Sequence, residues 1–334
     1  MLDAHQLTQD IKNWARQAGF DLVGIALPEK SRFSHEYNQW LREGKHGDMA
    51  YLARTADRRN DLSAAFPWVK SVVCVAMAYY QQMPEAPADA TTDLAPAESA
   101  AADDGMGKVA RYAWGRDYHK VLLKALKTLE VRLRSALPAT SADEFVSRAY
   151  VDTGPIDERD LAARAGLGWV GKNTLLIHPV HGSWFVLGEL LTSLPLPADH
   201  PLPDRCGTCT RCIDVCPTGA IAPYKVDATR CISYQTLENR GDIPPELHGP
   251  MAQAGFLAGC DICQDVCPWN RRPLVTSQPE FAPAAPAPAI GLKHILNFSE
   301  TQWDQLTRGK AHRRAKWAMW RRTAAILADA RTGS

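Results

Sequence analysis

The first 195 residues interleave helix-like and strand-like patterns of apolar positions. Residues 1–20 repeat apolar side chains every three or four positions, on one face of a helix, whereas 21–26 and 71–80 are short apolar runs typical of buried strands. Further helices are predicted at 34–44, 117–137 and 158–168, and further strands at 145–152 and 183–192. This order predicts a mixed α/β (α+β) domain.

Segments rich in Pro, Ala and Asp divide the chain. Residues 83–105 have almost no large apolar side chain, which predicts a solvated loop insertion. The proline-spaced stretches 194–204 and 277–289 indicate links between domains. We therefore expect an N-terminal domain at 1–195, a cysteine-rich domain at 196–275 and a short helical C-terminal region at 276–334.

Composition narrows the classes of protein. With 334 residues, 46% of them hydrophobic, the chain can bury a sizeable core. Its formal net charge of +1 gives no global field toward nucleic acid or membranes, so any basic footprint must be local. No apolar stretch approaches the roughly 18 residues of a membrane helix, and the N-terminus lacks the apolar centre of a signal peptide. We expect a cytoplasmic protein with no membrane partner.

The nine cysteines fall into two groups. Cys74 stands alone in an apolar strand, where it is expected to be a small buried hydrophobic residue. The other eight lie between residues 206 and 267. Their clustered C-x-x-C spacing in a cytoplasmic chain favours metal binding over disulfides.

The stretch CGTCTRCIDVCP, residues 206–217, has the C-x2-C-x2-C-x3-C-P pattern with which bacterial ferredoxins hold cubane iron–sulfur clusters. In this pattern three thiolates bind one cluster and the fourth binds another. A zinc ribbon instead has two C-x-x-C pairs about 15 to 20 residues apart. The pattern therefore favours iron–sulfur clusters, and zinc or mixed occupancy is the alternative.

A second, incomplete copy of the pattern lies at 257–268. Leu257 stands in its first position and cannot bind iron, which leaves Cys231 as the substitute ligand. With this substitution the cysteines form two complete sets of four, and two [4Fe–4S] clusters are predicted. Cluster one takes Cys206, Cys209, Cys212 and Cys267, and cluster two takes Cys216, Cys231, Cys260 and Cys263.

Two adjacent clusters form a one-electron wire, and a ferredoxin-like electron carrier is the simplest function for it. A carrier needs only the cysteine-rich domain, so the N-terminal domain is expected to hold a site where the electrons are used. Asp152 is a candidate because it ends a strand, where α/β sheets bind ligands, although Asp is also a common turn cap. The stretch GLGWVGKN at 166–173 permits close approach to a ligand but lacks the dinucleotide-binding pattern.

Six stretches in order over residues 110–272 carry a resemblance to a known family. They are RYAWGRDYHK, VDTGPIDERDLAARAGLGWVGKNTLL, GSWFVLGELLT, CGTCTRCIDVCPTGAI, DATRCISYQTLE and GCDICQDVCPWN. Together they resemble the epoxyqueuosine reductases, cobalamin and iron–sulfur enzymes of the last step of queuosine synthesis in tRNA. A ferredoxin pattern alone is common, but its combination with D-T-G-P and G-W-x-G-K-N is specific. The insertion at 83–105 is longer than the family pattern, and the C-terminal region is shorter.

The resemblance implies a base-off cobalamin in the N-terminal domain, next to the nearer cluster. It points to Asp152 as the proton donor and as a cobalamin neighbour. The other cobalamin neighbours that it implies are Arg59, Lys172, Asn173, Thr174, Ser183, Ser233 and Asp261. No D-x-H-x-x-G motif supplies a histidine to cobalt, which agrees with base-off binding.

The implied reaction removes the epoxide oxygen of epoxyqueuosine in the tRNA anticodon loop, consuming two electrons and two protons and leaving an alkene and water. The hard step belongs to the cofactor, and an external low-potential donor of flavodoxin or ferredoxin type supplies the electrons. Asp152 acts as general acid, held protonated by a partly desolvated pocket. The rival functions are a corrinoid reductase of a small molecule, like the reductive dehalogenases, and the electron carrier.

A tRNA substrate requires a local basic surface. Residues 308–322 carry seven Arg or Lys and no acidic residue, and the stretch NRR at 270–272 follows the second cysteine pattern. Phosphate contacts by these cations would depend on salt. The alternative is a solvated amphipathic helix with Ala315, Met319 and Trp320 facing the core. We expect the protein to act as a monomer.

Overall fold

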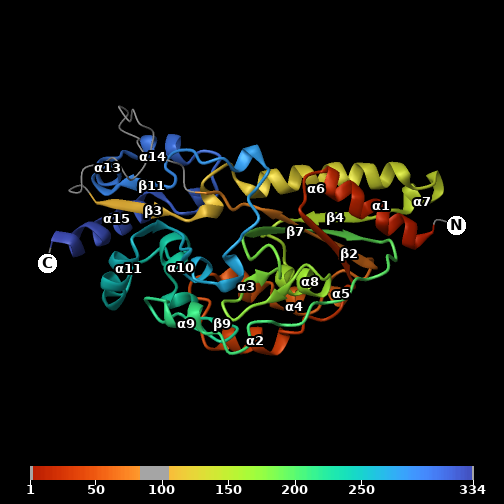
Figure 1. Cartoon of the computed structure of the whole chain (residues 1–334), viewed down its shortest axis with the longest axis horizontal. Coiled ribbons are helices and arrows are strands. Elements are labelled where there is room, and N and C mark those ends of the chain that lie inside the picture. Colours follow the sequence, from red (N-terminus) through yellow and green to blue (C-terminus); the bar gives the residue numbers. More distant parts are fainter. Residues whose placement is uncertain (1–2, 83–104, 333–334) are drawn as a thin grey trace.

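The computed structural model describes residues 3–82 and 105–332, and its centre is a four-stranded antiparallel sheet (Figure 1). The strand order is β1 (Leu22–Ala26), β2 (Ser71–Ala78), β7 (Phe185–Thr192) and β4 (Ser147–Tyr150). Every neighbouring pair is antiparallel, so this part is of the α+β type and the strand-end argument from parallel sheets does not apply to Asp152. The four predicted strands are confirmed. The predicted insertion at 83–105 lies outside the described residues, apart from its last residue.

Strand β2 is buried along its whole length because both of its faces are covered. Val73, Val75 and Met77 point into one hydrophobic cluster with α1 (Ala4–Gln17) and α6 (Tyr118–Ala136). Val72, Cys74 and Ala76 point into another with α5 (Leu62–Ala65) and α8 (Glu158–Arg164), which lies across the sheet from α6 (Figure 1). Since successive side chains of a strand face opposite sides, this explains the unbroken apolar run. Cys74 is fully buried, as predicted.

A second, smaller sheet joins three distant parts of the chain. Strand β3 (Met106–Val109) pairs in parallel with β10 (Phe256–Ala258) and in antiparallel with β11 (Ala289–Gly291). The sequence patterns did not reveal these strands because each has only three or four residues. Leu257 lies in β10 with 1% of its surface exposed, inside the core of this sheet. An apolar residue at this position of the second cysteine pattern therefore serves the core.

The C-terminal residues pack against the second sheet through α13 (Leu292–Asn297), α14 (Glu300–Thr307) and α15 (Trp317–Thr332). The remaining elements are α2 (Ser34–Arg42), α3 (Ala50–Arg54), α4 (Ala56–Asn60), α7 (Ala139–Glu144), β5 (Trp169–Val170), β6 (Leu176–Ile177), α9 (Arg211–Asp214), β8 (Ile221–Ala222), β9 (Lys225–Val226), α10 (Ile232–Leu237), α11 (His248–Ala254) and α12 (Ile262–Asp265), with short 3-10 turns between them. None of the described helices is long and apolar enough to span a membrane.

The basic segment 308–322 is not one continuous helix, because a 3-10 turn at Ala311–Arg314 precedes α15. The predicted inward residues of this segment are buried; they are Ala315, Met319 and Trp320. Several of its cations have internal acceptors. Arg314 makes two hydrogen bonds of 2.7 Å with the carboxylate of Glu238, and Arg322 donates to the Gln235 carbonyl at 2.6 Å. These two arginines tie the C-terminal region to the cysteine-rich segment, and tRNA contact by residues 308–322 stays a prediction.

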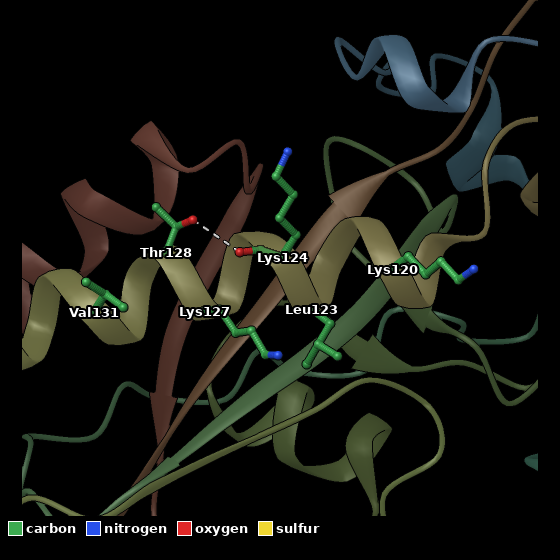
Figure 2. A pocket seen from close by; sticks show the side chains of 6 residues that line it. All are labelled: Lys120, Leu123, Lys124, Lys127, Thr128 and Val131. Carbon is green, nitrogen blue, oxygen red and sulfur yellow. Dashed lines mark hydrogen bonds between the residues drawn. The ribbon is translucent and has the colours of Figure 1, made fainter. Parts of the chain in front are cut away.

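The outer face of α6 is basic and carries no such partners. Lys120, Lys124 and Lys127 line a shallow hollow there, together with Leu123, Thr128 and Val131 (Figure 2). The three lysines are exposed, and their side chains make no hydrogen bond or ion pair within residues 3–82 and 105–332.

Replacing Leu257 with Ala should destabilise the fold, because the change leaves a cavity between the second sheet and the C-terminal helices. The expected loss is about 2–5 kcal/mol of unfolding free energy, measured as a lower urea midpoint. Val131→Ala is the matched control, since Val131 is 66% exposed; its effect is expected within about 0.5 kcal/mol. Equal midpoints for the two variants would contradict the buried role of β10.

Candidate active site between the sheet and the cysteine-rich segment

A cavity of about 420 Å³ lies between the four-stranded sheet and the cysteine-rich segment. The sheet contributes Phe185 and Val186 to its wall, and Tyr112 and Tyr118 contribute aromatic rings. Four residues predicted as cobalamin neighbours line it: Asn173, Thr174, Ser233 and Asp261. The four cysteines predicted for cluster two also line it: Cys216, Cys231, Cys260 and Cys263. No histidine is among the described residues of its wall.

A second cavity of about 590 Å³ adjoins the first and shares Arg159, Thr174 and Val226 with it. Arg59 lies in its wall, where its guanidinium donates a 2.8 Å hydrogen bond to the Ile156 carbonyl. The two cavities together make an extended hollow, mostly apolar with a few placed polar groups, as binding sites for large cofactors are.

The cysteines predicted for cluster one line a separate small cavity, with Lys172 and Trp269 beside them. They are Cys206, Cys209, Cys212 and Cys267. Lys172 Nζ donates to the carbonyls of Gly207 at 2.7 Å and Cys209 at 3.1 Å. These hydrogen bonds place Lys172 Nζ at the loop of cluster one, and its predicted contact with cobalamin stays a prediction.

Asp152 follows β4 in a strained backbone conformation. Its φ of 58° lies in the left-handed region, which is rare for a residue with a side chain. Its backbone N–H donates a 2.5 Å hydrogen bond to Glu158 Oε1, which holds this conformation. Thr174, on the wall of both cavities, has a φ of 65°. Strained residues of this kind concentrate at functional sites.

His119 is the ionisable partner of Asp152. Its Nε2 lies 3.1 Å from Asp152 Oδ2, and its Nδ1 lies 2.7 Å from Asp117 Oδ1. Its ring stacks on Tyr118, with centroids 4.1 Å apart, and Tyr118 lines the first cavity. The His119–Asp152 pair therefore lies beside the cavity wall.

The two charges of this pair stabilise each other. Burial would lower the pKa of His119, but its hydrogen bonds to Asp117 and Asp152 raise it from 6.5 to about 9. Burial would raise the pKa of Asp152, although its side chain is 59% exposed; the hydrogen bond and charge of His119 outweigh burial and hold that pKa below 3.8. At neutral pH the proton therefore resides on His119.

This corrects the expectation that Asp152 is held protonated by a desolvated pocket. No role for His119 was evident from the sequence, because the stretch around it also fits a helix start capped by Asp117. Asp117 does cap α6, since its carboxylate accepts the His119 backbone N–H at 3.1 Å. The contact between His119 and Asp152 joins residues 33 positions apart, which no local pattern reveals.

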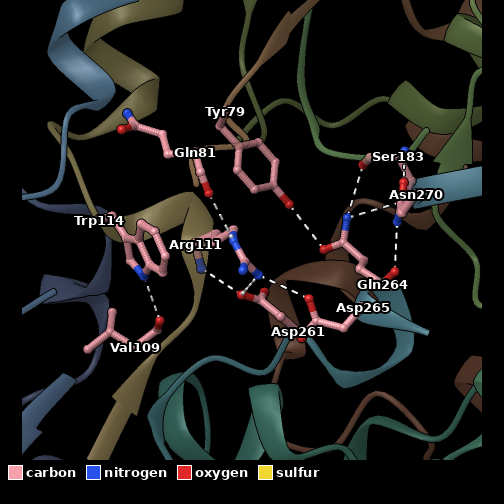
Figure 3. Close-up of polar contacts among 10 residues, drawn as sticks. All are labelled: Tyr79, Gln81, Val109, Arg111, Trp114, Ser183, Asp261, Gln264, Asp265 and Asn270. Carbon is pink, nitrogen blue, oxygen red and sulfur yellow. Dashed lines mark hydrogen bonds and ion pairs between the residues drawn. The ribbon is translucent and has the colours of Figure 1, made fainter. Parts of the chain in front are cut away.

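Asp261 belongs to a network that attaches the cysteine-rich segment to the sheet (Figure 3). Its carboxylate accepts the Arg111 backbone N–H at 2.7 Å, and the Arg111 guanidinium pairs with Asp265 at 3.0 Å. Burial raises the pKa of Asp261 to about 7. The Arg111 guanidinium also lies about 5 Å from the ring centroids of three aromatic residues, Tyr80, Trp114 and Trp184.

Ser183 lies in the neighbouring part of the same network (Figure 3). Its hydroxyl accepts hydrogen bonds from Asn270 at 2.9 Å and from Gln264 at 3.2 Å. The Tyr79 hydroxyl donates to Gln264 Oε1 at 3.0 Å. Ser183 is buried and lines neither cavity, and its predicted contact with cobalamin stays a prediction.

Two stretches of the chain match known protein families. Residues 205–270 match the family described as "4Fe-4S double cluster binding domain". Residues 59–153 match the family described as "Epoxyqueuosine reductase QueG, DUF1730". The first match covers all eight clustered cysteines, and the second includes Asp152 and His119.

Solved structures of similar proteins share the fold over most of this chain. A crystal structure of an epoxyqueuosine reductase with an epoxyqueuosine-modified tRNA-Tyr stem loop has a TM-score of 0.83 and 29% identity, and the match covers 97% of this chain and 81% of that chain. A structure from Bacillus subtilis, with its catalytic aspartate loop swung out of the active site, has a TM-score of 0.83 and 28% identity, covering 97% and 82%.

Curated relatives are similar over nearly the full length. The epoxyqueuosine reductase of Synechocystis sp. is 42% identical over 305 residues, which cover 91% of this chain and 98% of the relative. That of Escherichia coli is 40% identical over 326 residues, which cover 97% and 81%. With identity at this level over almost its entire length, and with the fold shared, the chain belongs to the epoxyqueuosine reductase family.

Proposed function

We propose that this chain reduces epoxyqueuosine to queuosine in tRNA, with the reacting group in the cavity between the sheet and cluster two. The observation that carries the proposal is that groups suited to electron transfer and groups suited to proton transfer lie at the same cavity. The cysteines predicted for cluster two line its wall, and a His119–Asp152 pair that holds a proton lies beside it. A relative crystallised with an epoxyqueuosine-modified tRNA stem loop supports tRNA as the substrate.

The reaction needs one electron source and one proton source. Removal of the epoxide oxygen breaks two C–O bonds, forms a C=C bond and, with two electrons and two protons, releases water. The match of residues 205–270 to a double-cluster family supports two [4Fe–4S] clusters as the electron path. Each predicted set of four cysteines lines a single cavity, which supports the proposed ligand sets. Cluster one takes Cys206, Cys209, Cys212 and Cys267, and cluster two takes Cys216, Cys231, Cys260 and Cys263.

The extended hollow fits a base-off cobalamin. Its wall offers polar groups that can bind the amide side chains of a corrin ring; they are Asn173, Thr174, Ser233, Asp261 and Arg159. Arg59 lies in the adjoining cavity and can contact a more distant part of the cofactor. The first cavity has no histidine in its described wall that could bind cobalt. When bound, cobalamin would supply the low-valent cobalt that makes the C–O bond reactive.

The proton path runs through two side chains of the chain itself. His119 Nε2 holds the proton against Asp152 Oδ2, at 3.1 Å. Transfer along this hydrogen bond gives a neutral Asp152, which can donate the proton to the epoxide oxygen as a general acid. Asp117 stabilises the imidazolium from its other side, so the proton is retained until a substrate oxygen competes for it. Glu158 positions Asp152 through the backbone hydrogen bond.

Single-turnover reduction tests the proposed function. Protein reconstituted with iron, sulfide and cobalamin is mixed anaerobically with an epoxyqueuosine-modified anticodon stem loop and excess dithionite. Mass spectrometry is expected to show loss of one oxygen from the modified base. Loaded protein that leaves the base unchanged would contradict the proposal, as would equal conversion by protein without cobalamin.

Asp152→Asn should slow the chemical step by about 10²–10⁴-fold, because an amide cannot pass on the proton. The same change should lower the pKa of His119 from about 9 toward 6.5, because it removes one of the two carboxylates that stabilise the imidazolium. NMR titration of the His119 ring measures this shift without any cofactor. Turnover is expected to decline above pH 9, as the imidazolium is lost.

Asp117→Asn is the matched control for this experiment. It should also lower the pKa of His119, since it removes the partner at Nδ1, but it leaves the Asp152 carboxyl in place. Its loss of turnover is therefore expected to be concentrated at high pH, whereas that of Asp152→Asn extends over the whole range. Near-normal turnover of Asp152→Asn with cobalamin bound would contradict the general-acid role and leave Asp152 with a turn-capping role only.

Cys231→Ala should remove cluster two and spare cluster one, because only the second set includes Cys231. Iron per chain should fall by about half, since two equal clusters become one. Cys74→Ala is the control, because Cys74 is fully buried in the sheet and belongs to neither set. Full iron content in Cys231→Ala would show that another residue completes the second set.

A further inference from the structure

Four exposed arginines flank the cysteines of cluster one, and we name them the arginine collar. They are Arg205, Arg211, Arg271 and Arg272. Arg205 and Arg211 each directly precede a cysteine of this set, in the loop and the short helix α9. None of the four guanidinium groups makes a hydrogen bond, an ion pair or an aromatic contact within the described residues. They differ in this from Arg314 and Arg322, which have internal acceptors.

The acidic residues near the collar are fewer and are already engaged. Asp265 is paired with Arg111 at 3.0 Å. Asp204 accepts the Cys206 backbone N–H at 2.7 Å, and Asp214 accepts the Thr210 hydroxyl at 2.7 Å. The charge of Asp265 is balanced by Arg111, so the four arginines face only two unbalanced carboxylates, those of Asp204 and Asp214. The surface is therefore locally positive, although the chain as a whole is nearly neutral.

A hollow of about 510 Å³ lies within the collar. Arg211 and Arg271 line it, together with Asp214, Asp265, Val215, Val266, Pro268 and Cys267, a predicted ligand of cluster one. Val215, in this wall, is 39% exposed. Charged side chains around an exposed apolar one are a common form of protein-docking surface, and the positive excess here comes from the four arginines, since Asp265 is paired with Arg111. This surface lies directly over a cluster ligand.

We propose that the arginine collar is the docking site of an acidic one-electron carrier protein, which delivers electrons at cluster one. The inference rests on the proposed function. Cysteines of cluster one line the cavity next to the collar, and cysteines of cluster two line the cavity of the candidate active site. An electron that enters at the collar can therefore follow the two clusters inward.

The electron count requires two encounters per turnover. A carrier with a flavin hydroquinone or a reduced iron–sulfur centre gives one electron at each encounter and leaves as the flavin semiquinone or with the oxidised iron–sulfur centre. Two such electrons with two protons convert the epoxide to an alkene and water. Repeated encounters favour fast association and fast release, which charge attraction between exposed surfaces provides.

The competing occupant is the tRNA backbone, which also binds arginines. The overlap of the collar with the cluster-one cavity favours the carrier, because a bound tRNA at this place would cover the point where electrons can enter. The test therefore measures both partners.

The experiment compares Arg211→Glu/Arg271→Glu with Lys124→Glu/Lys127→Glu on α6 (Figure 2). The two double variants change the net charge equally, and both lysines are exposed and unpartnered within the described residues. An acidic flavodoxin serves as the probe. Its affinity for the loaded protein is measured by titration, and its rate of cluster reduction by stopped flow, at low and high salt.

The collar variant is expected to bind flavodoxin at least about tenfold more weakly and to lose most of the salt dependence of reduction. The α6 variant should behave as the parent. Dithionite should reduce the clusters of all three proteins equally, because it needs no docking surface. If the iron content of the glutamate variant falls, Arg211→Gln/Arg271→Gln takes its place. The glutamine variant is expected to lose less flavodoxin affinity, because it removes the two positive charges without adding negative ones.

Unchanged flavodoxin affinity in the collar variants would overturn the proposal. So would a loss of stem-loop affinity without a loss of flavodoxin affinity, since the collar would then be a tRNA surface. Failure of the proposed function is separable from both results. It would appear as absent conversion of the stem loop with dithionite, a reaction in which the carrier takes no part.

Discussion

The attachment of the cysteine-rich segment to the antiparallel sheet through Arg111 is the contact on which the rest of the site depends. The guanidinium is 14% exposed and pairs with Asp265, while the Arg111 backbone holds Asp261 (Figure 3). Asp261 lies between two cysteines of cluster two, and the chain leads from Arg111 directly to His119. Arg111 therefore joins the cysteine-rich segment to the part of the chain that leads to His119.

The arrangement separates the two supplies that the reaction needs. In the proposed reaction, electrons arrive from the cysteine-rich side, where the cysteines of the two predicted sets line neighbouring cavities. The proposed proton source lies on the sheet side, where His119 is charged at neutral pH because it lies between two carboxylates. The strained backbone of Asp152 and its hydrogen bond to Glu158 hold the carboxyl beside His119. Keeping the proton on His119 leaves the site charged and ready until an oxygen atom comes within reach of Asp152.

Local patterns predicted the elements, and long-range contacts escaped them. The β2 run was legible because both faces of the strand are buried, and the cluster cysteines were legible because seven of the eight fall in two short C-x-x-C runs. The sheet of β3, β10 and β11 was not, since strands of three or four residues pair across more than a hundred positions. The long-range partners of His119, Arg314 and Arg322 were not predictable for the same reason, because these contacts also join residues far apart in sequence. The family pattern named Lys172 and Ser183 as cofactor neighbours, whereas their hydrogen bonds to Gly207 and Asn270 join residues 35 and 87 positions apart, which no local pattern reveals.

The electron paramagnetic resonance spectrum of cobalamin in its Co(II) state, bound to the anaerobically reconstituted protein, tests the central claim most directly. That claim is that the hollow between the sheet and cluster two holds a base-off corrin, and its described wall offers no histidine to the metal. The corrin is expected to stay with the protein on gel filtration and to give a spectrum without splitting from an axial nitrogen. A spectrum split by such a nitrogen, or a corrin that separates from the intact protein, would contradict it.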